Sequence, residues 1–232
     1  MRVVTAVDRS ERLRAVPTTH PLPEANPTRE PLSFHLRLPG YEPTRLVDTR
    51  GIAGRLGLRR LWVKDESSRM GLPAFKIMGA SWAVYRAVSA ALRERTGRGI
   101  QPWIAIDRLA VQLEPLRPLT LTCATDGNHG RAVARMARLL GFSARILVPA
   151  DMAPVRIAAI AGEDAEVIRH DGTYDEAVAR SAQEADDRTL VISDTSWPGY
   201  EEVPRWVIEG YSTIFWEIED ELAALGEPGP EV

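Results

Sequence analysis

The sequence predicts an α/β fold built on a doubly wound, mostly parallel sheet. From residue 118 onward, short apolar segments alternate with longer amphipathic segments. The apolar segments are continuous rather than interrupted by polar residues, as expected for strands that are buried on both faces. Strands that alternate with helices form βαβ units, in which neighbouring strands run parallel and helices cover both faces of the sheet.

The first half of the chain contains fewer regular segments. Residues 1–31 are polar and rich in proline, so we predict an irregular arm. A short helix is expected at about 46–56, and a strand at 60–64. A long helix is expected at 74–95, because apolar residues recur there at helical spacing until the sequence TGRG ends the pattern.

The second half alternates regularly. A connection at 97–118 carries a short helix over IDRLAVQLE, and the last helix is followed by the turn-forming residues GEPGPEV. Beyond the connection, strands are predicted at 118–124, 143–150, 165–170 and 189–194. Helices are predicted at 127–141, 152–162, 173–186 and 204–225.

Composition and charge exclude several classes of protein. Apolar residues make up 44% of the 232-residue chain, charged residues 26%, and the net charge is −3, so no basic surface for nucleic acid is expected. The single cysteine, Cys123, excludes an intramolecular disulfide and fits a reduced, cytoplasmic location. No segment has the apolar length of a signal peptide or membrane span, and the four histidines are too dispersed for a metal site.

Lys76 is the first candidate for chemistry. It lies in PAFKIMGAS, in the first turn of the long predicted helix. The partly positive helix N-terminus disfavours a cation, so we expect a lowered lysine pKa and a more nucleophilic amine. Gly79, Ala80 and Ala83 share the face of Lys76, which should leave space for a flat or bulky group. The alternative is a lysine that only extends to solvent from an amphipathic helix.

A glycine-containing turn is the second candidate. TCATDGNHGRAVARMA passes from an apolar strand through a turn into a helix, the geometry in which backbone N–H groups bind an anion or polar ligand. Gly127 and Gly130 permit close approach of a ligand to the backbone, and Asn128 offers a donor and an acceptor. The alternative is that Asp126 or Asn128 only caps the helix. His129 is expected to pack or orient rather than to catalyse.

Two aspartates complete the candidate site. Asp126 follows one predicted strand and Asp194 follows another, so in a parallel sheet both carboxylates lie at the same edge. Two acids beside a lysine are suited to proton transfer at a carbon next to an imine. Each aspartate can also be a simple turn or cap residue.

Three segments, VKDESSRMGLPAFKIMGASWA, ATDGNHGRAVA and SDTSWPGYEEVPRWVIEGYSTI, together resemble the diaminopropionate ammonia-lyase family. That family belongs to the fold type II, tryptophan-synthase-β-like pyridoxal-phosphate enzymes. The resemblance runs from LPGYEPT to the last predicted helix, and so covers most of the chain. It implies a fold type II architecture with a nearly complete small domain and an incomplete large domain.

The resemblance also implies a cofactor, pyridoxal 5′-phosphate. Lys76 would form a Schiff base with its aldehyde, and Phe75 would lie beside it. Asn128 would donate a hydrogen bond to the ring hydroxyl, and Gly127 and Gly130 would complete the cofactor-binding turn.

The implied reaction is α,β-elimination of 2,3-diaminopropionate, a small amino acid, to pyruvate and ammonia. Asp126 occupies a position where many relatives have Ser or Thr, and would remove a proton from one substrate enantiomer. Asp194 would handle the amino group or the α-proton. The cofactor would stabilise the carbanion as an electron sink.

The domain organisation follows from the same resemblance. We expect an irregular arm at 1–31, the N-terminal part of a large cofactor domain at 32–86, a small α/β domain at 87–200, and a return helix with a truncated end at 201–232. Members of the family are longer, and no GGGxG-like phosphate loop follows Tyr211. The chain is therefore interpreted as a fragment, one half of a split enzyme that needs a complementing C-terminal half, or a degenerate relative; a homodimer is a further possibility.

Two other functions stay open. Another fold type II activity, a threonine or serine dehydratase or a β-replacement synthase, is disfavoured by Asp126 in place of a hydroxyl residue. A non-catalytic binding or regulatory protein is favoured by the missing phosphate loop. A dinucleotide-binding protein is disfavoured, because no GxGxxG follows a strand.

Overall fold

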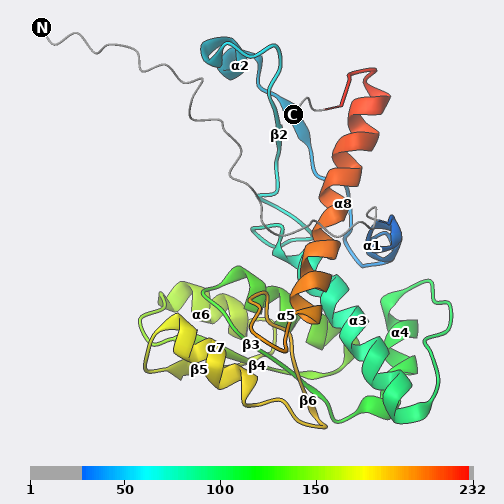
Figure 1. Ribbon diagram of the computed structural model, residues 1–232, viewed down its shortest axis with the longest axis vertical. Coiled ribbons are helices and arrows are strands. Elements are labelled where there is room, and N and C mark those ends of the chain that lie inside the picture. Colours follow the sequence, from blue (N-terminus) through cyan, green and yellow to red (C-terminus); the bar gives the residue numbers. More distant parts are fainter. Residues whose placement is uncertain (1–27, 230–232) are drawn as a thin grey trace, which may run out of the picture.

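The structure of this chain is a computed structural model that describes residues 28–229. Most of the predicted arm, residues 1–27, lies outside the described residues. In chain order, the elements in Figure 1 are α1 Glu30–His35, β1 Leu46–Asp48, α2 Arg50–Leu56, β2 Trp62–Lys64, α3 Lys76–Thr96, α4 Ile106–Gln112, the 3₁₀ turn η2 Glu114–Leu116, β3 Thr120–Ala124, α5 Asn128–Leu140, β4 Ser143–Pro149, α6 Pro154–Ala161, β5 Glu166–His170, α7 Tyr174–Ala182, β6 Thr189–Val191 and α8 Glu202–Ala224.

A four-stranded parallel sheet organises the lower part of the molecule in Figure 1, with strand order β5-β4-β3-β6. The strand β3 is central, and it pairs with β4 on one side and with β6 on the other. The crossover connections α5, α6 and α7 make each pairing parallel, as the alternating pattern predicted. The predicted parallel α/β fold is therefore confirmed for this sheet.

Alternate residues of β4 show that helices cover both faces of the sheet. Ile146 and Val148 belong to the main apolar core, which also contains the buried face of α5. Leu147, between them, belongs to a separate cluster with Ala177 and Val178 of α7. Since neighbouring side chains of a strand point to opposite faces, α5 and α7 lie on opposite sides of the sheet.

The long helices α3 and α8 cross in close contact between this sheet and the upper part of the molecule (Figure 1). Two glycines permit the crossing. A Cβ atom on Gly210 would lie 2.5 Å from the carbonyl oxygen of Met78 and 2.8 Å from Cα of Gly79. A Cβ atom on Gly79 would lie 2.6 Å from the ring of Tyr211. The backbones of α3 and α8 therefore approach so closely that a side chain at either position would collide with the other helix.

Buried His35 joins α1 to both helices of this crossing. Its Nε2 lies 2.9 Å from the carbonyl oxygen of Met78, so this nitrogen carries the proton and donates. Its Nδ1 lies 2.8 Å from Oγ1 of Thr213 and accepts from that hydroxyl. Burial lowers the pKa of His35 to about 3, so the imidazole is neutral at physiological pH.

The short helix predicted at 46–56 is only partly correct. Residues Leu46–Asp48 form the strand β1, which pairs antiparallel with β2, and the helix begins only at Arg50. Pairing of Val47 with Val63 draws these residues into a strand, a long-range contact that the local pattern does not contain.

Smaller differences concern the ends of elements. Helix α1 was not predicted, although Pro31 stands in its first turn, a favoured position for proline. Helix α7 ends at Ala182 and β6 ends at Val191, earlier than the expected 186 and 194. The remaining helices and strands of the second half lie within a few residues of their predicted ranges. The predicted domain boundaries stay predictions.

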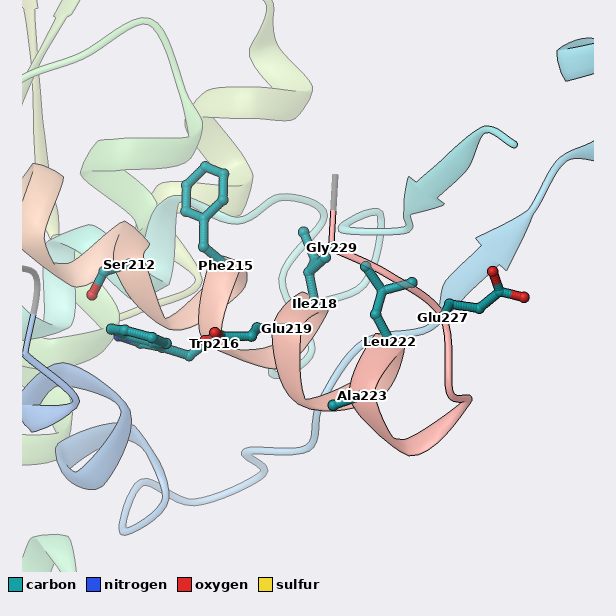
Figure 2. A pocket seen from close by; sticks show the side chains of 9 residues that line it. All are labelled: Ser212, Phe215, Trp216, Ile218, Glu219, Leu222, Ala223, Glu227 and Gly229. Carbon is teal, nitrogen blue, oxygen red and sulfur yellow. The ribbon is translucent and has the colours of Figure 1, made fainter. Parts of the chain in front are cut away.

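The C-terminal half of α8 carries a largely apolar groove, shown in Figure 2. The groove has a volume of about 470 Å³, and Phe215 on its wall is 68% exposed. An adjoining hollow of about 500 Å³ extends from Phe215 to Trp62 of β2. The groove is lined by Ser212, Phe215, Trp216, Ile218, Glu219, Leu222, Ala223, Glu227 and Gly229.

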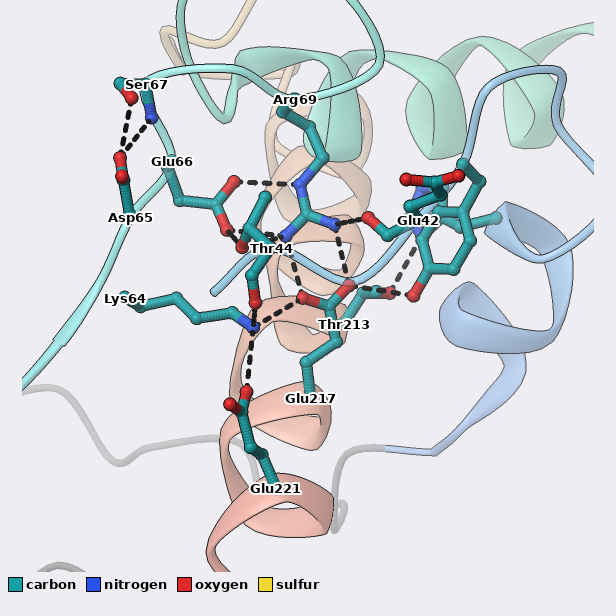
Figure 3. A network of polar contacts seen from close by, with 12 residues as sticks. Glu42, Thr44, Lys64, Asp65, Glu66, Ser67, Arg69, Thr213, Glu217 and Glu221 are labelled. Atoms are coloured by element: carbon teal, nitrogen blue, oxygen red, sulfur yellow. Dashed lines mark hydrogen bonds and ion pairs between the residues drawn. The ribbon is translucent and has the colours of Figure 1, made fainter. Parts of the chain in front are cut away.

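A buried ion network fastens α8 to the segment that precedes Lys76 (Figure 3). Arg69, with no exposed surface, donates to both carboxylate oxygens of Glu217 at 2.7 and 2.8 Å and to Glu66 at 2.9 Å. Lys64 of β2 lies 2.9 Å from Glu217, and the hydroxyl of Tyr41 donates to it at 2.7 Å. Arg69 also donates to the carbonyl oxygen of Glu42 and to the hydroxyl of Thr44, so each terminal nitrogen of its guanidinium has hydrogen-bond partners.

Between residues 28 and 229, no helix combines the length and the hydropathy that crossing a membrane requires. Over the same range, no three or more His, Cys, Asp or Glu side chains are grouped as a metal ion would need.

Replacing Gly210 with alanine should destabilise the protein. Alanine favours a helix by about 1 kcal/mol over glycine, but its Cβ would meet the backbone of α3, and overpacking of this kind costs about 1–3 kcal/mol. We expect a net loss in the free energy of unfolding, measured by urea denaturation. Gly229→Ala, where no atom lies within 4 Å of an added Cβ, is the control, and equal stability of the two variants would contradict the close crossing.

Replacing Glu217 with alanine should cost about 3–5 kcal/mol of stability, because it leaves Arg69 buried without its main partner. Glu219→Ala, on the exposed side of the same helix, should change stability by less than about 1 kcal/mol. Both are measured by urea denaturation, and similar losses would contradict the assignment.

The same network predicts a dependence on pH. Burial alone would raise the pKa of Glu217, but hydrogen bonds from Arg69, Lys64 and Tyr41 hold it below its ordinary value. This stabilisation is present above the unfolded-state pKa and is lost as the pH falls through the folded-state pKa. The difference in free energy of unfolding between the wild-type chain and Glu217→Gln, measured by urea denaturation, should therefore become smaller as the pH is lowered.

Candidate active site

A cavity of about 500 Å³ lies where the strands β3 and β6 end and where α3 begins. In open α/β sheets, this carboxyl edge is where ligands bind. Lys76, Asp126 and Asp194 all line the cavity, as the sequence predicted for one sheet edge. Its other lining residues are Pro73, Thr125, Gly127, Asn128, His129, Arg131, Val155, Arg156, Ala159, Ile160 and Tyr174.

Lys76 is the first residue of α3, and its side chain reaches the loop after β6. Its Nζ donates to Oδ2 of Asp194 at 2.9 Å. The side chains of Lys76 and Asp194 are 33% and 18% exposed, so the ion pair is partly shielded from water. The alternative of a lysine that only extends to solvent is therefore wrong.

The pKa of Lys76 is raised, opposite to the prediction from its position at a helix N-terminus. Burial acts to lower it, but the hydrogen bond to Asp194, the neighbouring Tyr211 and the charge of Asp194 together outweigh burial. Burial likewise opposes ionisation of Asp194, yet His129 and the Lys76 ammonium hold the pKa of the carboxyl below its ordinary value. The pair is thus an ammonium and a carboxylate at neutral pH.

His129 lies behind Asp194. Its Nε2 donates to the carbonyl oxygen of Ile192 at 2.7 Å, and its Nδ1 lies 3.7 Å from Oδ2 of Asp194. Burial lowers the pKa of His129, so the ring is neutral and the main counter-charge of Asp194 is Lys76. Nδ1 has no hydrogen-bond partner within the described residues, and the packing or orienting role of His129 stays a prediction.

Tyr200 fixes the loop that carries Asp194. Its hydroxyl donates to the carbonyl oxygen of Val191 at 2.6 Å and accepts from the backbone N–H of Ser193 at 3.0 Å. The Tyr200 ring stacks on Trp197 with a centroid distance of 4.0 Å. The backbone on both sides of this turn is therefore held, and the carboxylate is directed at Lys76.

Thr125, rather than Asp126 or Asn128, satisfies the start of α5. Its Oγ1 accepts from the backbone N–H of Gly127 at 3.0 Å and from that of Gly130 at 3.1 Å. The alternative that Asp126 or Asn128 only caps the helix is wrong, because α5 has Gly127 as its N-cap with no side-chain cap bond. Gly127 has φ +152°, a conformation that favours glycine.

Asp126 and Asn128 are consequently available to a ligand. Both are exposed at the cavity, and neither side chain forms a hydrogen bond within residues 28–229. The N–H groups of the first turn of α5 have no partner within the helix and give this end a partial positive charge. Arg156 stands opposite, and its guanidinium donates to the backbone oxygen of Asp126 at 3.2 Å.

Two predicted cofactor residues do not line the cavity. Gly130 is buried, and a Cβ there would lie 2.3 Å from Cγ2 of Thr125 and 2.7 Å from Cγ2 of Ile146, so its small size serves packing. Phe75 precedes α3 and packs edge-on against Tyr211. Contact of either residue with a cofactor stays a prediction.

The small face of α3 is not open space, contrary to the expectation from Gly79, Ala80 and Ala83. The side chains of Tyr211 and Val207 of α8 fill the site above Gly79, and Ala80 and Ala83 are fully buried. The flat group that this face accommodates is therefore the ring of Tyr211.

Several residues that line the cavity were not predicted from the sequence. The position of Thr125 could have indicated its role, since a hydroxyl residue before a helix often bonds to the N–H groups of the first turn. No local sequence pattern indicates Arg156 or Tyr174, because they lie on α6 and α7 and reach the cavity only through the tertiary fold.

Asp194→Asn should make the amine of Lys76 more reactive. Without the carboxylate, burial dominates and the pKa of Lys76 falls. Acetylation by acetic anhydride at pH 8, followed by mass spectrometry, should show several-fold faster modification of Lys76. Lys64, the only other lysine, is the internal reference, and Asp151→Asn is the matched control. Unchanged or slower acetylation would contradict the ion pair.

Comparison with known proteins places this geometry in a family. The family model described as "Pyridoxal-phosphate dependent enzyme" matches residues 37–230. The chain is 36% identical over 206 residues to diaminopropionate ammonia-lyase of Salmonella typhimurium, covering 88% of this chain and 50% of that protein. It is 34% identical over 209 residues to the Escherichia coli diaminopropionate ammonia-lyase, covering 90% and 51%.

The fold agrees with a solved relative. The apo crystal structure of E. coli diaminopropionate ammonia lyase superimposes with a TM-score of 0.75 and 34% identity, over 85% of this chain and 53% of that chain. This match confirms the predicted fold type II α/β class. The chain spans about half the length of the curated relatives it matches. From the family match and the shared fold, we conclude that this chain belongs to the pyridoxal-phosphate dependent enzyme family.

Proposed function

We propose that this chain forms half of a pyridoxal-phosphate-dependent lyase that catalyses α,β-elimination of 2,3-diaminopropionate. With one water consumed, the products are pyruvate and two molecules of ammonia. The observation that carries the proposal is the ion pair of Lys76 and Asp194, 2.9 Å apart, in the cavity that Asp126 also lines. Similarity to the two ammonia-lyases supports the choice of substrate. A cytoplasmic location stays a prediction.

The residues present fit the ring end of pyridoxal phosphate. Lys76 supplies the amine for covalent attachment, Asn128 offers an unpaired amide for the ring hydroxyl, and Gly127 leaves the backbone accessible. When bound, the cofactor supplies an electron sink for the carbanion formed at the substrate α-carbon. The residues 28–229 contain no glycine-rich loop of the GGGxG kind for the phosphate group.

The two aspartates of the cavity have different roles in the proposed reaction. Asp126 is exposed to the cavity and is held by no side-chain bond, so its carboxylate can accept the α-proton of one substrate enantiomer. Asp194 already binds one ammonium group, that of Lys76, and can bind the amino group of the substrate in the same way. The Tyr200 contacts hold the loop that carries Asp194 while the charges change.

We further propose that the groove on α8 packs against a polypeptide that corresponds to the half of the relatives to which this chain has no matching residues. The groove and the adjoining hollow at β2 are mainly apolar, and Phe215 and Ile208 on α8 are 68% and 69% exposed. An exposed apolar patch of this kind marks a surface that packs against other polypeptide. The proposed occupant is a complementing C-terminal half, and a second copy of this chain is the alternative.

A threonine or serine dehydratase is the second candidate, and the exposed carboxylate of Asp126 disfavours it. A non-catalytic relative is the third candidate, supported by the lack of a phosphate loop among the described residues.

Attachment of the cofactor is tested by trapping. The chain is incubated with pyridoxal phosphate, reduced with sodium borohydride and mapped by mass spectrometry, with and without the unmatched half of the Salmonella relative. The pyridoxyl adduct is expected on Lys76 and not on Lys64, and Lys76→Arg should abolish it. An adduct on Lys64, or none in either condition, would overturn the assignment.

The reaction is tested by measuring pyruvate from diaminopropionate and serine, and 2-oxobutyrate from threonine, in the complemented protein. Diaminopropionate should be preferred. Asp126→Asn should lower kcat by about 100- to 10,000-fold, the range for loss of a general base. Asp194→Asn should lower kcat/KM, because it removes the carboxylate that would bind the substrate amino group. Preference for serine or threonine would favour the dehydratase reading, and full activity of both variants would remove the aspartates from the mechanism.

A further inference from the structure

A buried phenol lies beside the candidate nucleophile. Tyr211 of α8 is placed with its ring centroid 5.8 Å from Nζ of Lys76. Its hydroxyl is buried and has no hydrogen-bond partner within the described residues. A buried hydroxyl without a partner costs free energy, so the position of this hydroxyl beside Lys76 needs an explanation.

The position of the ring is built into the helix crossing. Gly79 leaves the space that the ring occupies, since an added Cβ would lie 2.6 Å from Cε1 and 2.7 Å from Cζ of Tyr211. On its other side, the ring meets Phe75 edge-on, with centroids 5.1 Å apart and planes at 73°. Phe75 is the N-cap of α3 and Gly79 lies in its first turn, so the phenol is held against the same turn that carries the amine.

We propose that Tyr211 is a positioning residue for Lys76: its hydroxyl is the second partner of the amine, and it keeps the amine directed into the cavity when Asp194 engages the ammonium group of a substrate. The proposal deepens the proposed function and rests on it for the role of Asp194. A phenol suits this task because it both accepts and donates a hydrogen bond.

The charges around the ring agree with this role. Burial raises the pKa of Tyr211, although the Lys76 ammonium acts to lower it, so the phenol is neutral at physiological pH. The charged groups that face it are Lys76 on α3 and Asp194 in the loop after β6, with neutral His129 behind Asp194. Tyr211 in turn acts with Asp194 to raise the pKa of Lys76. A neutral partner can hold the amine without fixing its proton as firmly as a carboxylate does.

Tyr211→Phe tests the proposal, because phenylalanine keeps the ring above Gly79 and removes only the hydroxyl. The first readout is the pH profile of acetic anhydride labelling of Lys76 in the cofactor-free chain. The midpoint should move to lower pH in Tyr211→Phe. The movement should be larger in the Asp194→Asn background, where the phenol is the main remaining partner. Ser212→Ala, which removes another buried unpartnered hydroxyl one residue along α8, is the matched control and should leave the profile unchanged.

The second readout is trapping of pyridoxal phosphate with borohydride. Tyr211→Phe should still be labelled on Lys76, with the pH of half-maximal labelling moved in the same direction, and in the complemented protein kcat should fall more than KM changes. Unchanged acetylation profiles in both backgrounds would overturn the role of Tyr211, even if cofactor labels Lys76. If the acetylation midpoint shifts but pyridoxal phosphate labels no lysine, the effect of Tyr211 on Lys76 is supported and the proposed function is contradicted. Urea denaturation checks that the variant is folded.

Discussion

The ion pair between Lys76 and Asp194 is the interaction on which the site depends. It joins the first residue of α3 to the loop after β6, two segments 118 residues apart in the chain. Without it, the positive end of α3 and burial would both favour a neutral amine. With it, the amine is protonated and directed, and its reactivity depends on what Asp194 binds. In the proposed function, Asp194 would bind the amino group of the substrate, so substrate binding would change the reactivity of the Lys76 amine.

The surrounding scaffold explains why this pair has one geometry. The crossing of α3 and α8 allows no side chain at Gly79 and Gly210, so the two helices cannot shift along each other without collision. The Arg69–Glu217 contacts fasten α8 to the segment just before Lys76 (Figure 3). Loss of Glu217 is accordingly expected to disturb folding before chemistry. The acids lie on turns and loops that a rigid frame positions, as is common for functional groups in α/β proteins.

Much of this could be predicted from the sequence, and the exceptions have a common cause. The alternation of apolar segments with amphipathic segments predicted the parallel sheet, and the positions of Asp126, Asn128 and Asp194 after predicted strands placed them at one edge. Local pattern could not predict β1, which exists because it pairs with β2, nor the sign of the pKa change at Lys76, which depends on an acid far away in sequence. The sequence did not predict the position of Tyr211 for the same reason, because only the crossing of α3 and α8 places it beside the Lys76 amine.

The state of the Lys76 amine is the most direct test of this account. Since the chain has only two lysines, ¹⁵N-lysine labelling gives two Nζ resonances, and Lys76→Arg assigns them. Following the Lys76 resonance through a pH titration of the cofactor-free protein should give a pKa above the ordinary lysine value, because the carboxylate of Asp194 outweighs burial. A pKa at or below that value would show that the pair does not form, and would contradict the central claim.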